Sequence, residues 1–180
     1  MITVTLMKRL GWVHPEAWAA SFAIACPAYG INTKDRLAAF LAQVGHESGS
    51  GRFTKEIWGP TEAQAKYEGR RDLGNAEKGD GLRFRGRGAI QITGRANTTT
   101  ARDALKPDMP IDMFCSWLET TDGAATSAAW WWASRKLNAL ADAGRFDDIT
   151  RRVNGGFNGR DDRNARWIKA KTVLAEDPAK

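Results

Sequence analysis

Apolar residues at helical spacing mark the clearest predicted element of the chain. Within residues 33–48, Leu37, Phe40, Leu41 and Val44 recur at i, i+3, i+4 and i+7, so one face of this helix belongs to the core. The Asn-Thr-Lys-Asp segment at its start supplies N-terminal capping groups. We therefore predict a helix that begins near residue 33 and packs along one stripe.

Further helical patterns cover most of the chain. Residues 14–28 form a predicted helix with Pro15 and Glu16 in its first turn, and we expect it to belong to the mature fold and not to a signal peptide. The tryptophans at 130–132 lie on an Ala-rich helix, and most of them are expected in the core. The remaining predicted helices cover residues 91–105, 113–119, 122–135, 136–143, 146–153 and 161–175.

The middle of the chain follows a different pattern. Residues 69–95 contain seven glycines and six arginines without a helical period, and residues 82–87 form a short predicted strand. We expect a small β-hairpin region at about 67–90 between helical lobes at about 1–66 and 91–180. The predicted fold class is mainly α (α+β), in a single domain of 180 residues.

Composition and charge narrow the class of partner. A hydrophobic fraction of 42% and a charged fraction of 27% are those of a soluble globular protein. The net charge of +6 favours an acidic partner, which includes nucleic acid, anionic lipid and the anionic polymers of a bacterial envelope. Eight tryptophans suit stacking on sugars or on bases. No run approaches the roughly 18 apolar residues of a membrane span.

The motifs of metal, redox and nucleotide chemistry are missing from the sequence. Cys26 and Cys115 stand far apart and outside any CxxC pattern, so we expect two buried free thiols and no metal site. His14 and His46 belong to no catalytic triad pattern, and the glycine-rich stretches match no nucleotide-binding loop.

Glu47 is the first candidate for chemistry. It follows Val44 by three residues and Phe40 by seven, and so continues the apolar stripe at the end of its helix. Partial desolvation would raise the pKa of this carboxyl, as the general acid of a glycosidase requires. A frayed helix end with an exposed glutamate explains the same pattern and is favoured by periodicity alone.

A second carboxylate is needed in an inverting glycosidase, roughly 6.5–9.5 Å from the acid. Glu56, Glu62 and Glu68 follow the glycine-rich loop after Glu47, and their spacing does not separate them. Any one of the three is equally well explained as a solvated surface acid.

The segment RFRGRGAIQITG at 83–94 admits two interpretations. Its arginines resemble an RNA-binding arginine-glycine segment, but such segments repeat, and this one occurs once and runs into apolar residues. We favour a strand that passes close to a ligand, with Gln91 and Thr93 projecting to one face where they can hold a water or a sugar hydroxyl. Asn154, at the end of a predicted helix, is either a left-handed C-terminal residue or a ligand contact.

Taken together, these motifs resemble glycoside hydrolase family 19, the chitinase-like family used by many phage endolysins. The matching segments are FLAQVGHES at 40–48, FRGRGAIQITG at 84–94 and Asn-Gly-Gly at 154–156, and YEGRRDLGN at 67–75 is similar to the phage branch. The resemblance implies a lysozyme-like, two-lobed helical fold with a central substrate cleft. It also implies an inverting mechanism without a cofactor.

The resemblance assigns roles to individual residues. It implies that Glu47 is the general acid, that Glu56 is the second carboxylate, and that Thr93 holds the attacking water together with Glu56. The predicted substrate-binding residues are Gln91, Asn97, Asn154, His46 and Phe84, the last at a position where the family usually has tyrosine.

A compact basic domain of this family, without a secretion signal or chitin-binding module, looks like a phage lysin. We expect a monomer that cleaves the β-1,4 bonds of peptidoglycan strands for host cell lysis, and neither nucleic acid nor stable membrane insertion is expected. It would be made in the host cytoplasm and reach the periplasmic wall through a holin-type pore. The alternatives are a chitinase, or a nucleic-acid- or wall-binding module without catalysis.

Overall fold

The computed structural model describes residues 2–176, and most of them are helical. The elements in chain order are α1 (Val4–Leu10), α2 (Pro15–Ala28), α3 (Lys34–Glu47), α4 (Glu62–Ala65), the 3₁₀ helix η1 (Arg71–Leu73), α5 (Asp80–Arg83), α6 (Arg95–Leu105), α7 (Ile111–Leu118), α8 (Thr121–Ser134), α9 (Leu137–Asp142), α10 (Phe146–Asn154) and α11 (Arg160–Glu176).

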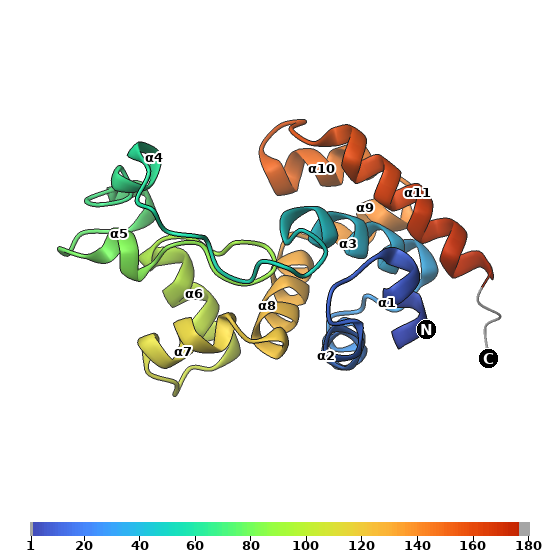
Figure 1. The fold of residues 1–180 in the computed structure, drawn as a ribbon, viewed down its shortest axis with the longest axis horizontal. Coiled ribbons are helices and arrows are strands. Elements are labelled where there is room, and N and C mark those ends of the chain that lie inside the picture. The colour runs from blue at the N-terminus through green and yellow to red at the C-terminus, as the bar shows by residue number, and fades with distance from the viewer. Residues whose placement is uncertain (1, 177–180) are drawn as a thin grey trace.

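The helices form two lobes on either side of α8 (Figure 1). One lobe holds α4 to α7 with η1, and the other holds α1 to α3 with α9 to α11. The larger lobe therefore combines both ends of the chain, while the smaller lobe is built from its middle. The lobes expected at about 1–66 and 91–180 divide the chain differently, because α6 packs against η1 and α7 and not against the C-terminal helices.

Helix α3 lies at the centre of the larger lobe. The Thr33 hydroxyl accepts a hydrogen bond from the backbone N–H of Arg36 at 3.2 Å, which confirms the predicted N-terminal cap. All residues from 37 to 45 are buried, including the four of the predicted apolar stripe. A single stripe is nevertheless too narrow a description, because α11, α9 and α10 also pack against this helix and cover its other faces.

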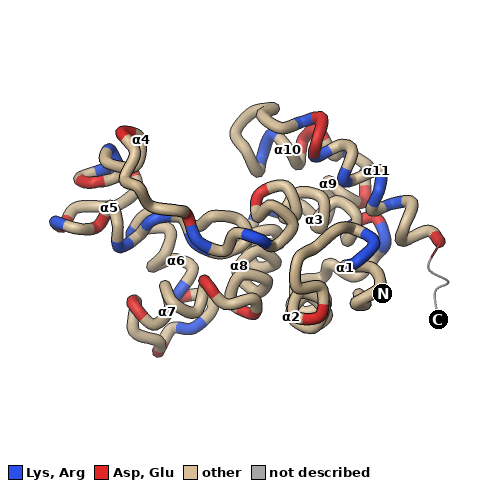
Figure 2. The backbone as a smooth tube through the Cα atoms, viewed as in Figure 1, with Lys and Arg blue, Asp and Glu red and all other residues tan. Residues whose placement is uncertain are grey.

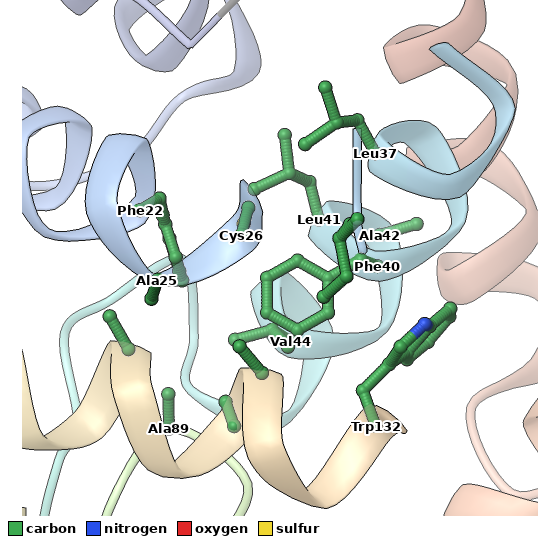
Figure 3. Close-up of a cluster of buried hydrophobic side chains, with 14 of the residues drawn as sticks. Phe22, Ala25, Cys26, Leu37, Phe40, Leu41, Ala42, Val44, Ala89 and Trp132 are labelled. Carbon is green, nitrogen blue, oxygen red and sulfur yellow. The ribbon is translucent and has the colours of Figure 1, made fainter. Parts of the chain in front are cut away.

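A row of aromatic rings joins α2, α3 and α8. Ring centroids lie 5.5 Å apart both for Phe22 and Phe40 and for Phe40 and Trp132, and both pairs are nearly perpendicular. Figure 3 shows the Phe40 ring between Phe22 of α2 and Trp132 of α8. Edge-to-face pairs contribute about 0.5–1.5 kcal/mol each beyond the area they bury. Helix α2 is thus part of the folded core, as predicted.

The other predicted helices are all present in the structure, although their ends differ. Those of the C-terminal half appear as α6 to α11, with ends shifted by at most four residues. Cys26 and Cys115 are free and buried, as expected, and burial raises the pKa of both thiols.

The β content is limited to two isolated antiparallel bridges, Lys55 with Arg87 and Arg87 with Ile92. The strand predicted at 82–87 is wrong in its first part, because residues 80–83 form α5. The Glu68 carboxylate accepts hydrogen bonds from the backbone N–H groups of Gly79 at 2.6 Å and Gly81 at 2.9 Å, and this acid at the helix start stabilises the turn.

Charged residues of both signs are mixed along the chain (Figure 2). Many of them pair, as Arg36 does with Asp142 and Arg160 with Asp147, each at 2.6 Å. The positive net charge is therefore spread over both lobes. Among residues 2–176, no helix combines the length and apolar character that crossing a bilayer requires.

Candidate active site

Glu47 is the last residue of α3 and faces a buried arginine. Nη2 of Arg163, on α11, donates a hydrogen bond to Oε1 of Glu47 at 2.5 Å. The Arg163 side chain is 1% exposed, whereas that of Glu47 is 22% exposed. Within the described part of the chain, Oε2 of Glu47 has no hydrogen-bond partner. The expected apolar surroundings of Glu47 are therefore replaced on one side by a cation, and one oxygen stays available for a ligand.

The arginine is itself fixed by a polar network inside the core. Its Nη1 donates to Oε1 of Gln43 at 2.6 Å, and its Nε donates to the Asn158 carbonyl at 3.2 Å. Gln43 in turn donates to the Thr150 hydroxyl of α10 at 2.8 Å. Three helices thus hold the guanidinium, and through it the Glu47 carboxylate. Sequence reasoning missed Arg163, because it stands among many other charged residues on α11.

Glu56 lies in the segment after α3, where each carboxylate oxygen accepts a hydrogen bond. Nε2 of Gln64 donates to Oε1, and the backbone N–H of Gly86 donates to Oε2, both at 3.0 Å. Tyr67 lies close by, and its pKa is raised by burial first and then by the negative charge of Glu56. The buried Gln64 was missed as well, although Thr61 and Gln64 have the Thr-x-x-Gln spacing of a capping box, which the structure forms.

Gly86 is the point around which the predicted catalytic and binding groups gather. A Cβ added there would lie 2.4 Å from Oε1 of Gln91, 3.2 Å from Oγ1 of Thr93 and 3.3 Å from Oε2 of Glu56. Glycine is required because any side chain would displace these groups. Gln91 has φ of 55° in the turn between Arg87 and Ile92, so the predicted extended backbone at this residue is wrong. The two side chains nevertheless converge.

The two rivals of Glu56 have different surroundings. Glu62 is an exposed residue in the first turn of α4. Both oxygens of Glu68 are used at the start of α5. Only Glu56 among the three approaches Gln91 and Thr93 around Gly86. The geometry thus distinguishes carboxylates that spacing alone did not.

A cavity of about 310 Å³ opens beside Gln91 and Thr93. One wall carries these two residues and Asn97, and the other is the end of α8, with Trp130, Trp131 and Arg135. This is the size range of small-molecule binding sites, roughly 300–1,000 Å³. Trp132 is fully buried, and Trp130 and Trp131 pack against the core but stay partly exposed here, so only one of the three expected core tryptophans is fully enclosed.

The remaining predicted sugar contacts differ in position. Asn97 lies in the cavity wall and donates to the Thr93 carbonyl at 2.8 Å. Asn154 is the exposed last residue of α10, and Gly155, not Asn154, takes the left-handed conformation that ends the helix.

His46 and Phe84 are engaged with protein groups. Nδ1 of His46 lies 2.7 Å from the Asp162 carboxylate of α11, which ties the end of α3 to that helix. Phe84 is fully buried, with the guanidinium of Arg95 4.8 Å from its ring centroid. Direct contact between Phe84 and a sugar is therefore a wrong prediction, because no part of the ring reaches the surface.

Two of the three arginines at 83, 85 and 87 are paired with carboxylates, and the third, Arg85, donates to the Leu82 carbonyl. Arg83 binds Asp112 through two hydrogen bonds of 2.8 and 2.9 Å. Arg87 is buried and binds Glu119 at 2.8 Å. The charges of Arg83 and Arg87 are thus neutralised within the fold, which weighs against the nucleic-acid interpretation. Across residues 2–176, no three His, Cys, Asp or Glu side chains are grouped so as to hold a metal ion.

Known sequences provide an independent comparison. A glycosyl hydrolase family 19 domain-containing protein of Haemophilus influenzae is 35% identical over 177 aligned positions, which cover 82% of this chain and 84% of that protein. An endochitinase of Arabidopsis thaliana is 33% identical over 132 positions, or 73% of this chain and 43% of the plant protein. No family model matches the chain.

Solved structures share the fold. Chitinase C from Streptomyces griseus superimposes with a TM-score of 0.73 and 21% identity, covering 97% of this chain and 92% of the chitinase. A class IV chitinase of the family from Zea mays gives 0.65 and 21%, covering 94% and 85%. The Haemophilus relative combines high coverage with clear identity, and the predicted lysozyme-like fold is confirmed. The chain belongs to glycoside hydrolase family 19 and is a glycoside hydrolase with the chitinase-like fold.

Proposed function

We propose that the protein cleaves β-1,4 glycosidic bonds of bacterial peptidoglycan by an inverting mechanism, as the lysis enzyme of a phage. The observation that carries the proposed chemistry is the grouping of Glu56, Thr93 and Gln91 around Gly86, beside a cavity and one loop away from Glu47. An inverting glycosidase needs one carboxylic acid for the leaving oxygen and one carboxylate for the attacking water.

We assign to Glu47 the role of proton donor to the leaving oxygen. Oε1 is held by Arg163, so that Oε2 is the oxygen left to carry the proton toward the glycosidic oxygen. The arginine fixes the direction of the carboxyl group, which matters because acid catalysis requires the donor within hydrogen-bond reach of its acceptor.

We assign to Glu56 and Thr93 the role of holding the water molecule that attacks the anomeric carbon. The Thr93 hydroxyl donates to the Gln91 carbonyl at 2.9 Å and keeps its lone pairs free for a hydrogen from water. The Glu56 carboxylate, oriented by Gln64 and Gly86, accepts a hydrogen bond from the second hydrogen of this water and takes up that same proton during the attack. The bond from water to the anomeric carbon forms as the bond to the leaving oxygen breaks.

The choice of peptidoglycan rests on charge. The chain carries +6 net charge, and murein is anionic whereas chitin is neutral, so electrostatic attraction favours the bacterial wall. The phage origin is supported by the YEGRRDLGN segment and by the positive net charge.

A second candidate is chitin itself, because four similar structures and two Arabidopsis relatives are named chitinases or endochitinases. The two substrates are separated by incubating the protein with purified murein and with chitin oligomers and measuring new reducing ends. We expect release from murein and loss of turbidity of permeabilised Gram-negative cells. Mass spectrometry of the reducing-end sugar then identifies the bond that is cut. Cleavage of chitin oligomers without action on murein would exclude the proposed substrate.

A further inference from the structure

Arg135 stands out in the cavity beside Thr93. It follows the last residue of α8, and its guanidinium carbon lies 3.8 Å from the centroid of the Trp131 ring. Nη1 donates a hydrogen bond to the Ser134 hydroxyl at 3.2 Å. The indole face and the neighbouring hydroxyl hold the guanidinium in the wall of the cavity that Asn97 and Thr100 also line.

No carboxylate neutralises this arginine within residues 2–176. Among the other arginines near the site, Arg87 is paired with Glu119, Arg95 with Asp80 and Arg163 with Glu47. Arg85, beside Gly86, donates to the Leu82 carbonyl and does not line this cavity. The residues that line the cavity include no aspartate or glutamate. Arg135 is therefore the cation that the protein leaves free for a ligand at this place.

The position of Arg135 makes an unpaired charge costly. The residue is only partly exposed, and desolvation lowers the pKa of its guanidinium. A guanidinium is still charged at neutral pH, and a partly desolvated cation without a counter-ion costs free energy until an anion binds. Arginine also presents paired N–H donors that match the two oxygens of a carboxylate.

Chitin and murein differ in whether they carry carboxylates that an arginine can bind. Chitin carries only neutral N-acetyl groups, whereas every second sugar of murein carries a lactyl arm that ends in a carboxylate or in a peptide with carboxylates of its own. A carboxylate bound at Arg135 would lie in the cavity that Gln91 and Thr93 also line, next to the predicted position of the attacking water.

We propose that Arg135, stacked on Trp131, forms a subsite for a carboxylate on the 3-O substituent of a muramyl residue and so selects murein over neutral glycans. This inference rests on the proposed peptidoglycan function and adds the residue that distinguishes murein from neutral glycans. The carboxylate can belong to the lactyl arm itself or to the attached peptide, and both supply the same anionic group.

The test compares three murein substrates: intact murein, glycan strands freed of peptide by an amidase, and the same strands with their carboxylates converted to neutral amides. For each one, kcat and KM are measured from reducing ends. We expect wild type to prefer the anionic strands over the amidated ones by at least about tenfold in kcat/KM, mostly through KM, because the ion pair forms on binding. If the peptide supplies the carboxylate, the same preference appears for intact murein over the peptide-free strands.

The variants are Arg135→Gln, which removes the charge, and Arg135→Lys, which keeps it. Lys136→Gln is the matched control, because it removes one positive charge from the next residue, which is exposed and outside the cavity wall. We expect Arg135→Gln to abolish the preference for the anionic substrate, Arg135→Lys to keep part of it, and Lys136→Gln to keep all of it. Thermal melting of each variant confirms that it is folded.

A folded Arg135→Gln protein that keeps the wild-type preference overturns the subsite while leaving the peptidoglycan function intact. The subsite is also overturned if wild type cleaves all three substrates equally. A wild-type protein that releases no reducing ends from any of them overturns the proposed function, and the subsite with it.

Discussion

The guanidinium of Arg163 donates to Oε1 of Glu47 at 2.5 Å, across 116 positions of the chain. The arginine is almost fully buried, and its other nitrogens bind Gln43 and the Asn158 carbonyl. The position of the proposed acid therefore depends on how α11 packs on α3, the pair of helices with the most extensive contact in the molecule.

Replacing Arg163 by lysine keeps the positive charge but removes the planar guanidinium, whose two terminal nitrogens bind Gln43 and Glu47 at the same time. We expect kcat to fall by roughly 100-fold, the effect of a misplacement of about 1 Å in an active site. Arg163→Ala leaves buried partners unpaired and lowers the unfolding free energy by about 3–5 kcal/mol in urea titrations. The control is Arg160→Lys at the exposed start of the same helix, which should keep wild-type kcat. Equal kcat for Arg163→Lys and wild type would show that Arg163 does not position Glu47 for catalysis.

Glu56→Gln tests the second carboxylate. The amide matches the shape of the carboxylate but cannot accept a proton, and its NH₂ group opposes one of the two donors, Gln64 or Gly86. We expect kcat to fall by about 100-fold or more, within the usual range for a general base. Glu62→Gln is the matched control, since Glu62 is exposed on α4. Comparable rates for the two variants would contradict the choice of Glu56.

A methyl group at Gly86 should disturb the site directly. Its carbon would lie 2.4 Å from Oε1 of Gln91, so either Gln91 or the backbone must move. We expect Gly86→Ala to remove most of the activity in a reducing-end assay while the helical circular dichroism persists. At Gly59 the nearest atom lies 3.5 Å from an added Cβ, so Gly59→Ala should stay active. Full activity of a folded Gly86→Ala protein would show that the three groups do not act together.

The pair Asp80 and Arg95 gives the fold a dependence on pH. Arg95 binds both oxygens of the buried Asp80, at 2.8 and 2.6 Å, and these hydrogen bonds lower the pKa of Asp80 below its usual value of 3.8. A depressed pKa contributes stability above the unfolded value, and this contribution is lost as the pH falls through the folded pKa.

Asp80→Asn should therefore lower the melting temperature at pH 7 and reduce it far less near pH 3, compared with wild type at each pH. The exposed pair of Asp72 with Arg70 provides the control. Asp72→Asn should change the melting temperature little at either pH, because water screens an exposed pair. A constant difference between Asp80→Asn and wild type across this range would contradict the assignment.

Sequence patterns predicted the long helices well, because periodicity and caps act locally. Thr33 before α3 and Pro15 at the start of α2 are such local signals. The four-residue helices α4 and α5 were missed, because so short a helix depends on specific partners, here Gln64 and Glu68.

The site shows the same division between local and distant contacts. The motifs that contain Glu47 and Thr93 are continuous in sequence, whereas spacing did not separate Glu56 from Glu62 and Glu68. Arg163 reaches Glu47 from a distant segment, Arg135 shares its cavity with the distant Gln91 and Thr93, and Arg95 lies over the ring of the buried Phe84. Such long-range packing leaves no local signature.

Reducing-end analysis of murein treated with wild type and with Glu47→Gln tests whether Glu47 donates the proton to the leaving oxygen. Glutamine fills the same space and can still accept a hydrogen bond from Arg163, but it cannot donate the proton to the leaving oxygen. We expect wild type to release glycan fragments with new reducing ends, and a folded Glu47→Gln protein to release them more slowly by roughly 100- to 10,000-fold. Release at the wild-type rate from Glu47→Gln would contradict this role of Glu47.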